Sequence, residues 1–202
     1  MVLGYRVCTF ALALGYFIEM LTRQGLTVLH YLTIWGLVCS ILSAGLMIFQ
    51  MYSPKNVKYH FFPGATFCVN IVVMVLYWQL YFQDPHLLYG DSPPLPWYRD
   101  DYLHFVGPML QCIDAAFIYK AFEVQKLQSL FTYYGISGSY VVMSETVFHL
   151  PYPFMLSLSF YERVLFYQKG LLVGTLGFIL GNLLTWVASK PRRLFSLSRN
   201  TP

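Results

Sequence analysis

Six long apolar runs fill most of this 202-residue chain, each interrupted by only a few polar side chains. The hydrocarbon core of a bilayer is about 30 Å thick, so a helix needs roughly 20 mainly apolar residues to cross it. We expect spans near residues 4–22, 27–50, 61–82, 101–122, 128–149 and 165–188. Because the runs lack the alternating pattern of barrel strands, they predict an all-α membrane protein, a single bundle of six transmembrane helices over residues 1–202.

The composition supports a membrane location. Charged residues make up 11% of the chain and hydrophobic residues 57%, whereas ordinary soluble domains are about 25% charged. The six spans leave no room for a separate soluble domain. The formal net charge of +4 reflects the bias of basic residues across the membrane rather than a nucleic-acid partner.

The distribution of lysine and arginine predicts the orientation, because cytosolic loops are enriched in both. The four basic residues on one side are Arg23, Arg99, Arg163 and Lys169, and the nine on the side of the N-terminus are Arg6, Lys55, Lys58, Lys120, Lys126, Lys190, Arg192, Arg193 and Arg199. The side with nine basic residues is predicted to be cytosolic, which places both termini in the cytosol. The sequence does not choose between the endoplasmic reticulum and the plasma membrane.

A stripe of glycines marks one face of the last predicted span. Gly170, Gly174, Gly177 and Gly181 are spaced four, three and four residues apart. Small residues let membrane helices approach closely, so this stripe predicts tight packing, either inside the bundle or against a partner chain.

Two longer connections lie on the predicted non-cytosolic side. Residues 83–100 are rich in proline and cannot be helical throughout. Residues 150–162 are too apolar for a free loop, and we expect them to lie in the membrane interface. There they either roof a pocket or merely connect two spans.

Polar side chains within or beside the spans gather in the predicted non-cytosolic layer. They come from four spans and are Glu19, His30, Thr33, His104, Glu145 and His149. Ionisable residues in a membrane are costly, and each is by default a candidate functional residue. This layer predicts a polar pocket that opens on one leaflet. Glu19 and Arg23, four residues apart, are expected to form an interfacial ion pair.

Asp114 is the one carboxyl group expected deep in a span. Left unpaired it would be strongly destabilising, so we expect a tyrosine or threonine hydroxyl as its partner. The four cysteines are scattered singly and form no pair typical of a metal or redox site. No cofactor is predicted.

Three kinds of site could use the polar layer. A metal site would draw on His30, His104, His149 and Glu145, but no recognised metal signature is present. A nucleophilic site would combine the Thr33 hydroxyl with His104 as a base, with Glu145 as a third member. Proton passage would use Asp114 and His104, although the rest of the cytosolic half is apolar. The residues favour a one-sided pocket over a pore.

Several short motifs resemble the androgen-induced protein family. They are Tyr31-Leu-Thr33-Ile, then Asp101-Tyr-Leu-His104-Phe-Val-Gly-Pro108 followed by Asp114, and Tyr152-Pro-Phe154 ahead of a glycine-rich last span. The resemblance covers most of the chain in span order. It implies six spans and an intramembrane hydrolase of fatty acid esters of hydroxy fatty acids. By position, it implies that Thr33 is the nucleophile and His104 the base.

The resulting expectation is a threonine-dependent hydrolase of lipid esters whose pocket opens to the non-cytosolic leaflet. Supporting residues would be Glu145, His149, His30 and Asp114. One alternative is a non-enzymatic lipid-binding protein or a subunit that packs through the glycine stripe. A less favoured alternative is a small proton-coupled transporter.

Overall fold

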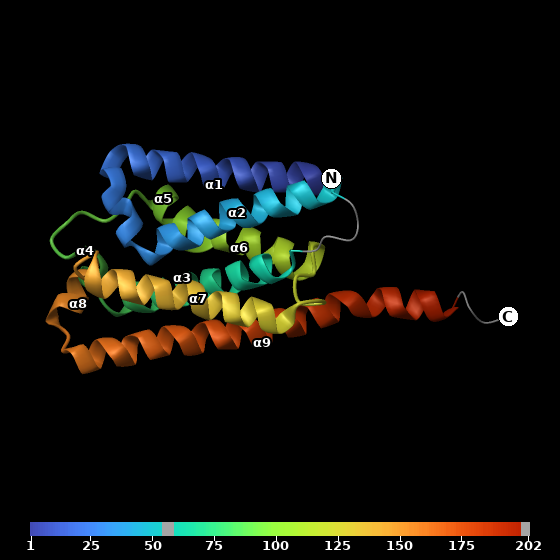
Figure 1. Cartoon of the computed structure of the whole chain (residues 1–202). Helices are drawn as coiled ribbons and strands as arrows, with labels where there is room; N and C mark the ends of the chain where they lie inside the picture. The colour runs from blue at the N-terminus through green and yellow to red at the C-terminus, as the bar shows by residue number, and fades with distance from the viewer. Residues whose placement is uncertain (54–58, 199–202) are drawn as a thin grey trace.

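The computed structural model describes residues 1–53 and 59–198, the last eight of these by their backbone alone, and every regular element in this part of the chain is helical. The elements are α1 (Val2–Gln24), η1 (Gly25–His30), α2 (Leu32–Tyr52), α3 (Phe61–Gln83), α4 (His86–Tyr89), α5 (Trp97–Asp101), η2 (Tyr102–Val106), α6 (Gly107–Ile113), η3 (Asp114–Ile118), α7 (Lys126–Thr146), α8 (Pro153–Ser157) and α9 (Phe160–Ser198). The segments α5, η2, α6 and η3 follow one another directly and form a fourth long helix (Figure 1). The expected all-α class is confirmed.

Four helical stretches are long and apolar enough to cross a membrane. They are Val2–His30, Leu32–Tyr52, Phe61–Gln83 and Phe160–Lys190, and they identify an integral membrane protein. Among the described residues, the fourth helix and α7 do not meet this requirement of length and apolar character. The fourth helix is divided into short segments, and α7 is rich in hydroxyl groups. Six crossings and cytosolic termini therefore stay predictions. Some of the basic residues used to predict the orientation lie outside the described part of the chain. They are Lys55, Lys58 and Arg199, together with the side chains of Arg192 and Arg193.

The second span does not begin at residue 27, as the apolar run suggested. Gly25 ends α1 with a φ of 63°, a left-handed conformation that glycine adopts without strain. Residues 25–30 then form the 3₁₀ helix η1, and Tyr31 is extended before α2 starts at Leu32. His30 therefore precedes the span, and Thr33 lies in its first turn.

Other helix boundaries also differ from the predicted span limits. The fourth helix begins at Trp97 rather than 101 and ends at Ile118, just before Lys120 takes a left-handed φ of 59°. Helix α7 ends at Thr146, and His149 has a φ of 52°. Glu145 and His149 are therefore not neighbours on one helix face, contrary to the sequence interpretation. Helix α9 runs over residues 160–198, well beyond the predicted 165–188.

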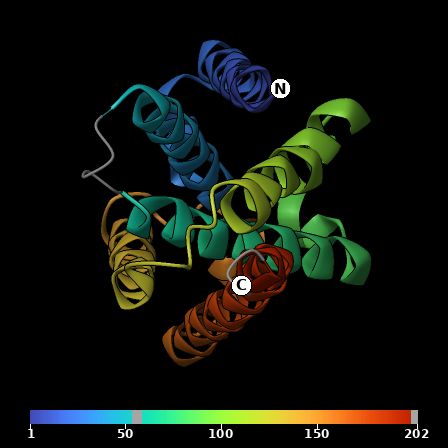
Figure 2. The same cartoon turned by 90° about the vertical axis from the view of Figure 1, so that its right-hand side faces the viewer.

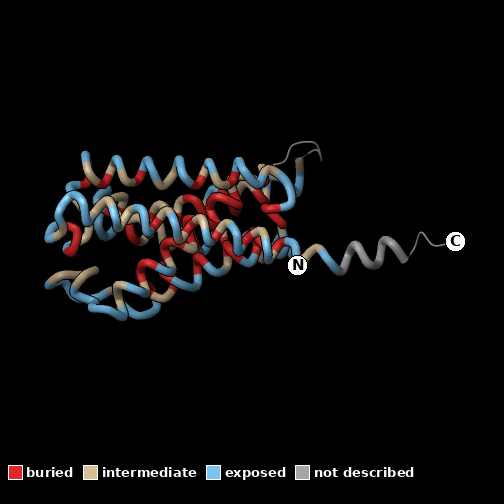
Figure 3. The backbone as a smooth tube through the Cα atoms, turned by 90° about the horizontal axis from the view of Figure 1, so that it is seen from below, coloured by how far each residue is buried: buried red, intermediate tan, exposed pale blue. Residues whose placement is uncertain are grey.

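Helix α3 lies at the centre of the bundle, with α2, α6, α7 and α9 packed around it (Figure 2). The buried Phe67 of α3 belongs to one core cluster with the buried side chains of Cys112, Phe122 and Tyr133. Buried residues concentrate where the helices meet, whereas the outward faces are exposed (Figure 3). Exposed apolar side chains on those faces are what a lipid-facing surface requires.

The glycine stripe packs inside the chain. A Cβ atom added at Gly174 would lie 2.1 Å from the Tyr133 ring, and one at Gly181 would lie 2.3 Å from the Phe122 ring. At Gly177 the nearest atoms belong to Ile71 of α3. The glycines thus admit side chains of neighbouring helices to the backbone of α9. A partner chain bound through this stripe stays a prediction.

Candidate active site

Thr33 and His104 lie within hydrogen-bonding distance of each other. Thr33 sits in the first turn of α2, and His104 lies in the π-helical segment η2 of the fourth helix. The Nε2 atom of His104 is 3.1 Å from the Thr33 hydroxyl oxygen. Single π-helical turns often occur at functional sites because they re-aim a side chain within a helix. This pair meets the geometric requirement for a nucleophile and its base.

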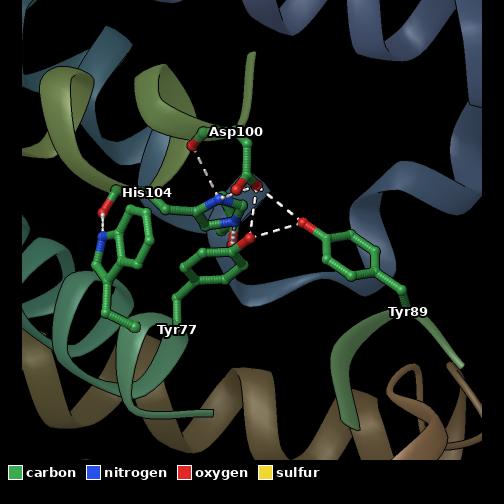
Figure 4. A network of polar contacts seen from close by, with 6 residues as sticks. Tyr77, Tyr89, Asp100 and His104 are labelled. Atoms are coloured by element: carbon green, nitrogen blue, oxygen red, sulfur yellow. Dashed lines mark hydrogen bonds and ion pairs between the residues drawn. The ribbon is translucent and has the colours of Figure 1, made fainter. Parts of the chain in front are cut away.

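Asp100 orients the other side of the His104 ring. Its Oδ1 atom lies 3.0 Å from His104 Nδ1 (Figure 4), and its backbone carbonyl is at the same distance. Both are acceptors, so the hydrogen-bond network assigns the ring proton to Nδ1 and leaves Nε2 free to accept the Thr33 hydroxyl proton. Asp100, His104 and Thr33 therefore form a connected acid, base and hydroxyl.

Two tyrosines hold the Asp100 carboxylate. Tyr77 of α3 donates to Asp100 Oδ1 at 2.6 Å and Tyr89 of α4 donates to it at 2.9 Å (Figure 4). The Tyr77 ring also stacks on the His104 ring, with centroids 3.4 Å apart and planes 2° apart. Burial raises the pKa of Tyr89, and the nearby Asp100 carboxylate raises it further, so the phenol remains a donor. Four elements thus fix one imidazole ring.

A third tyrosine, Tyr152, places its phenol on the Thr33 side of the site. The backbone N–H of Leu32 donates to the Tyr152 hydroxyl oxygen at 3.2 Å, which leaves the phenolic hydrogen available for another acceptor. Burial outweighs the lowering effect of the hydrogen bonds with the Leu32 backbone, Tyr140 and Thr33, and the pKa of Tyr152 is raised to about 12. The phenol is therefore protonated at neutral pH. The first turn of α2 adds the positive end of the helix dipole on the same side of the site.

A cavity of about 410 Å³ opens beside Thr33 and His104. Its size falls within the usual range for small-molecule sites, roughly 300–1,000 Å³. The walls are mainly aliphatic and aromatic side chains of α3, α7 and α9, such as Val72, Leu76 and Phe166. A mostly apolar cavity with a few polar groups at one place is suited to a lipid whose reactive polar group lies there.

Both longer connections line this cavity. Residues 151–155, which include the start of α8, contribute one part of the lining, and Leu88, Tyr89, Ser92, Pro93 and Leu95 contribute another. Contact between Gly90 and Pro153 joins the two connections. Of the two interpretations of residues 150–162, the structure supports the roof. The roof lies at the end of the bundle opposite the N-terminus (Figure 1).

Other residues of the predicted polar layer lie apart from this site. Glu145 accepts hydrogen bonds from Arg163 at 2.9 Å and Tyr167 at 2.7 Å, so the expectation that it orients His104 is wrong. His149 is exposed beyond the end of α7. His30 stacks on Phe148, with ring centroids 4.6 Å apart. Glu145 and His30 thus contact other residues, and His149 faces outward.

The partner of Asp114 is an arginine, not a hydroxyl group. Arg6 of α1 donates from Nε and from Nη2 to the two carboxylate oxygens of Asp114, each at 2.9 Å. Both residues are almost completely buried. Asp114 is ten residues beyond His104 on the same helix, about 15 Å away at 1.5 Å per residue, so it belongs to a separate structural pair. This arrangement gives no support to a direct relay between them.

The predicted ion pair of Glu19 and Arg23 is confirmed, with a distance of 3.0 Å from Nε to Oε1. Glu19 also binds Arg99 of α5 at 2.5 Å, which ties the end of α1 to the turn before Asp100. Among the described residues, no group of three or more His, Cys, Asp and Glu side chains is close enough to hold a metal ion.

Asp100 is the residue of the candidate site that the sequence interpretation missed. The spacing of Asp100 and His104, four residues apart, is the same signal that drew attention to Glu145 and His149. Asp100 was placed in the proline-rich connection, just outside the expected span. The structure starts the helix at Trp97, which puts both side chains on one face.

Comparison with known proteins gives one match. The profile of the FAR-17a/AIG1-like protein family matches residues 7–185, which include Thr33, Asp100 and His104. No curated protein and no solved structure matches the chain.

Proposed function

The chain belongs to the FAR-17a/AIG1-like family, and from that premise we propose that it is an intramembrane threonine-dependent hydrolase of lipid esters. The observation that carries the proposal is the 3.1 Å contact between His104 Nε2 and the Thr33 hydroxyl at the edge of an apolar cavity. Fatty acid esters of hydroxy fatty acids, the substrates implied by the family resemblance, are the proposed substrate class.

In the first half of the reaction, His104 Nε2 accepts the Thr33 proton as the hydroxyl oxygen attacks the ester carbonyl. The tetrahedral intermediate then breaks its bond to the alcohol oxygen, which takes the proton from His104 and leaves. Thr33 now carries the acyl group as an ester. Asp100 keeps the imidazole in the required tautomer and stabilises its protonated form.

In the second half, His104 accepts a proton from water as the water oxygen attacks the acyl-threonine carbonyl. Collapse of this second intermediate returns the proton to the Thr33 oxygen and releases the fatty acid. The negative oxygen of both intermediates needs donors that are already in place. The Tyr152 phenol lies on the Thr33 side of the site and is the donor that we assign, beside the positive end of the α2 helix dipole.

We also propose six membrane crossings with both termini in the cytosol, which places the roofed end of the cavity in the non-cytosolic leaflet of the endoplasmic reticulum or plasma membrane. Support comes from the six long helical stretches and the bias of basic residues. Fluorescent tags fused to each end, with selective permeabilisation of the plasma membrane, test this orientation. Protection of either tag from a cytosolic protease would contradict it.

The direct test of activity is hydrolysis by the purified protein in lipid nanodiscs. The substrates are a fatty acid ester of a hydroxy fatty acid and a fluorogenic methylumbelliferyl ester. We expect Thr33→Val and His104→Gln to reduce kcat by roughly 10³-fold or more, because the hydroxyl and its base act as a unit. Thr27→Val, at an exposed threonine of η1, is the matched control and should retain activity. Full activity in Thr33→Val would exclude the mechanism.

A non-enzymatic lipid-binding protein is the second candidate, and the cavity of about 410 Å³ favours it independently of any chemistry. It predicts binding of the same esters without turnover and no effect of Thr33→Val on affinity. Hydrolysis by the wild-type protein that disappears in Thr33→Val separates the two candidates.

A further inference from the structure

The cavity extends inward from the site as a limb between α3, α7 and α9. On α3 its lining runs from Tyr77, beside His104, to Val69. These positions are eight residues apart, so the limb is about 12 Å long at 1.5 Å per residue. On α7 the lining runs in parallel from Tyr140 to Tyr133.

The walls of the limb are aliphatic along much of its length. Val69, Val72 and Val73 line it from α3, and Leu171 lines it from α9. Gly170 lines the α9 side, where an added Cβ atom would make ordinary contacts with Leu76 at 3.6 Å and Val72 at 3.9 Å. A narrow aliphatic limb of this kind is suited to an unbranched hydrocarbon chain.

Tyr133 closes the inner end. It is 1% exposed, and its hydroxyl donates to the Gly170 carbonyl at 2.9 Å. The ring rests on the bare backbone of Gly174, where a Cβ atom would overlap it at 2.1 Å. Beyond it lies the packed core that includes Phe67 and Phe122. The floor is therefore fixed in position by one hydrogen bond and by close packing.

We propose that this limb is an acyl-chain subsite and that Tyr133 limits the length of the acyl chain that the protein accepts. The inference rests on the proposed function, because it assigns the limb to one half of the ester. The acyl half stays bound to Thr33 after the alcohol has left, so it is the half suited to a closed limb. The alcohol half then lies toward the roof.

The test is the dependence of kcat/KM on chain length, measured with methylumbelliferyl esters of straight-chain acids from butyrate to palmitate. Tyr133→Ala should raise the kcat/KM of the longest esters relative to the shortest by roughly tenfold or more, because the added space accepts extra methylene groups. Ser137→Leu, higher in the limb, should shift the preference toward short chains. Tyr134→Phe, at the neighbouring exposed tyrosine outside the cavity lining, is the control and should keep the wild-type profile.

A second series varies the alcohol chain with the acyl group held constant, and Tyr133→Ala should leave that profile unchanged. An unchanged acyl profile in both Tyr133→Ala and Ser137→Leu, with an active wild-type protein, would overturn the inference and leave the proposed hydrolase intact.

If the wild-type protein hydrolyses none of these esters, a binding measurement tests whether the limb holds an acyl chain. Fatty acids carrying a diazirine at the methyl end are photo-cross-linked to Thr33→Ala in nanodiscs, and the labelled peptides are identified by mass spectrometry. Chains that reach the floor should label the peptides of Val69 and Tyr133. Labelling confined to the roof, residues 151–155, would overturn the inference, whereas loss of hydrolysis alone counts only against the proposed function.

Discussion

A threonine hydroxyl is a weak nucleophile at neutral pH and needs an adjacent base. The proposed base for Thr33 is His104, and the ring of His104 is held by Asp100 at Nδ1 and by the stacked Tyr77. Each contact restricts the imidazole to one orientation and one tautomer. The proposed chemistry therefore depends on the residues behind His104 as much as on the reacting pair.

We predict that Asp100→Asn lowers kcat by roughly 10²- to 10⁴-fold with little change in KM. An amide can donate to Nδ1 and so favours the tautomer that carries its proton on Nε2, which cannot accept from Thr33. Ester hydrolysis by the purified variant measures the effect. Asp101→Asn, at the next position, is the matched control. Equal activity of the two variants would show that Asp100 does not orient the base.

Tyr152→Phe should lower kcat by roughly 10²- to 10³-fold, because it removes one donor to the tetrahedral oxyanion and leaves the ring in place. The rate of labelling by a fluorophosphonate should fall in parallel, since its tetrahedral adduct needs the same donor. KM for the ester should change little. Tyr161→Phe, at an exposed tyrosine, serves as the control. A raised KM with unchanged kcat would assign Tyr152 to substrate binding alone.

The sequence could indicate Thr33 and His104, because each is a polar side chain near the end of an apolar run, and the family resemblance selected both. It could not supply the partner of Asp114. Arg6 is 108 residues away in the chain, and no spacing rule says which faces of two distant helices meet. The expectation that Glu145 orients His104 is wrong because the Glu145 carboxylate, near the end of α7, faces Arg163.

At the scale of elements, the helix ends decide which polar residues meet. Left-handed residues interrupt the chain at Gly25, Lys120 and His149. None of these turns changes the hydropathy of its run enough to be seen in the sequence. The approximate places of the long helices could therefore be predicted from the apolar stretches, whereas η1, the early start of the fourth helix and its two π-helical segments could not.

The glycine stripe leads to a prediction at this scale. Gly181→Ala places a Cβ atom 2.3 Å from the buried Phe122 ring and should destabilise the protein by about 1–3 kcal/mol. Gly135→Ala is the matched control, because nothing lies within 4 Å of its added Cβ, and it should be neutral or stabilise the helix by about 0.5–1 kcal/mol. Thermal unfolding in detergent measures both. Equal melting temperatures would contradict the internal packing of the stripe.

At the scale of the whole molecule, two polar clusters lie at different depths of one bundle. The cluster of Asp100 and His104 lies under the roof, and the pair of Arg6 and Asp114 lies toward the end that holds the N-terminus. The ion pair of Arg6 and Asp114 links α1 to the fourth helix. The stretch that contains α1 is the least buried of the four apolar stretches. The sequence interpretation regarded this half as apolar apart from Asp114.

Arg6→Met should destabilise the fold by about 3–5 kcal/mol, because it leaves the Asp114 carboxylate buried without its charge partner. The double variant with Asp114→Leu should recover most of the loss, since no buried charge then remains. Unfolding by added denaturing detergent gives the comparison, with Lys126→Met as the control at an exposed basic residue. If the double variant were no more stable than Arg6→Met, the pair would not be the source of the effect.

The proposed mechanism requires that Thr33 becomes covalently modified with His104 as its base. The most direct measurement treats the purified protein in nanodiscs with a fluorophosphonate probe and locates the adduct by mass spectrometry. We expect one adduct, on Thr33, that is absent in Thr33→Val and formed at least roughly 10²-fold more slowly in His104→Gln. An adduct on another residue, or labelling that persists unchanged in Thr33→Val, would contradict it.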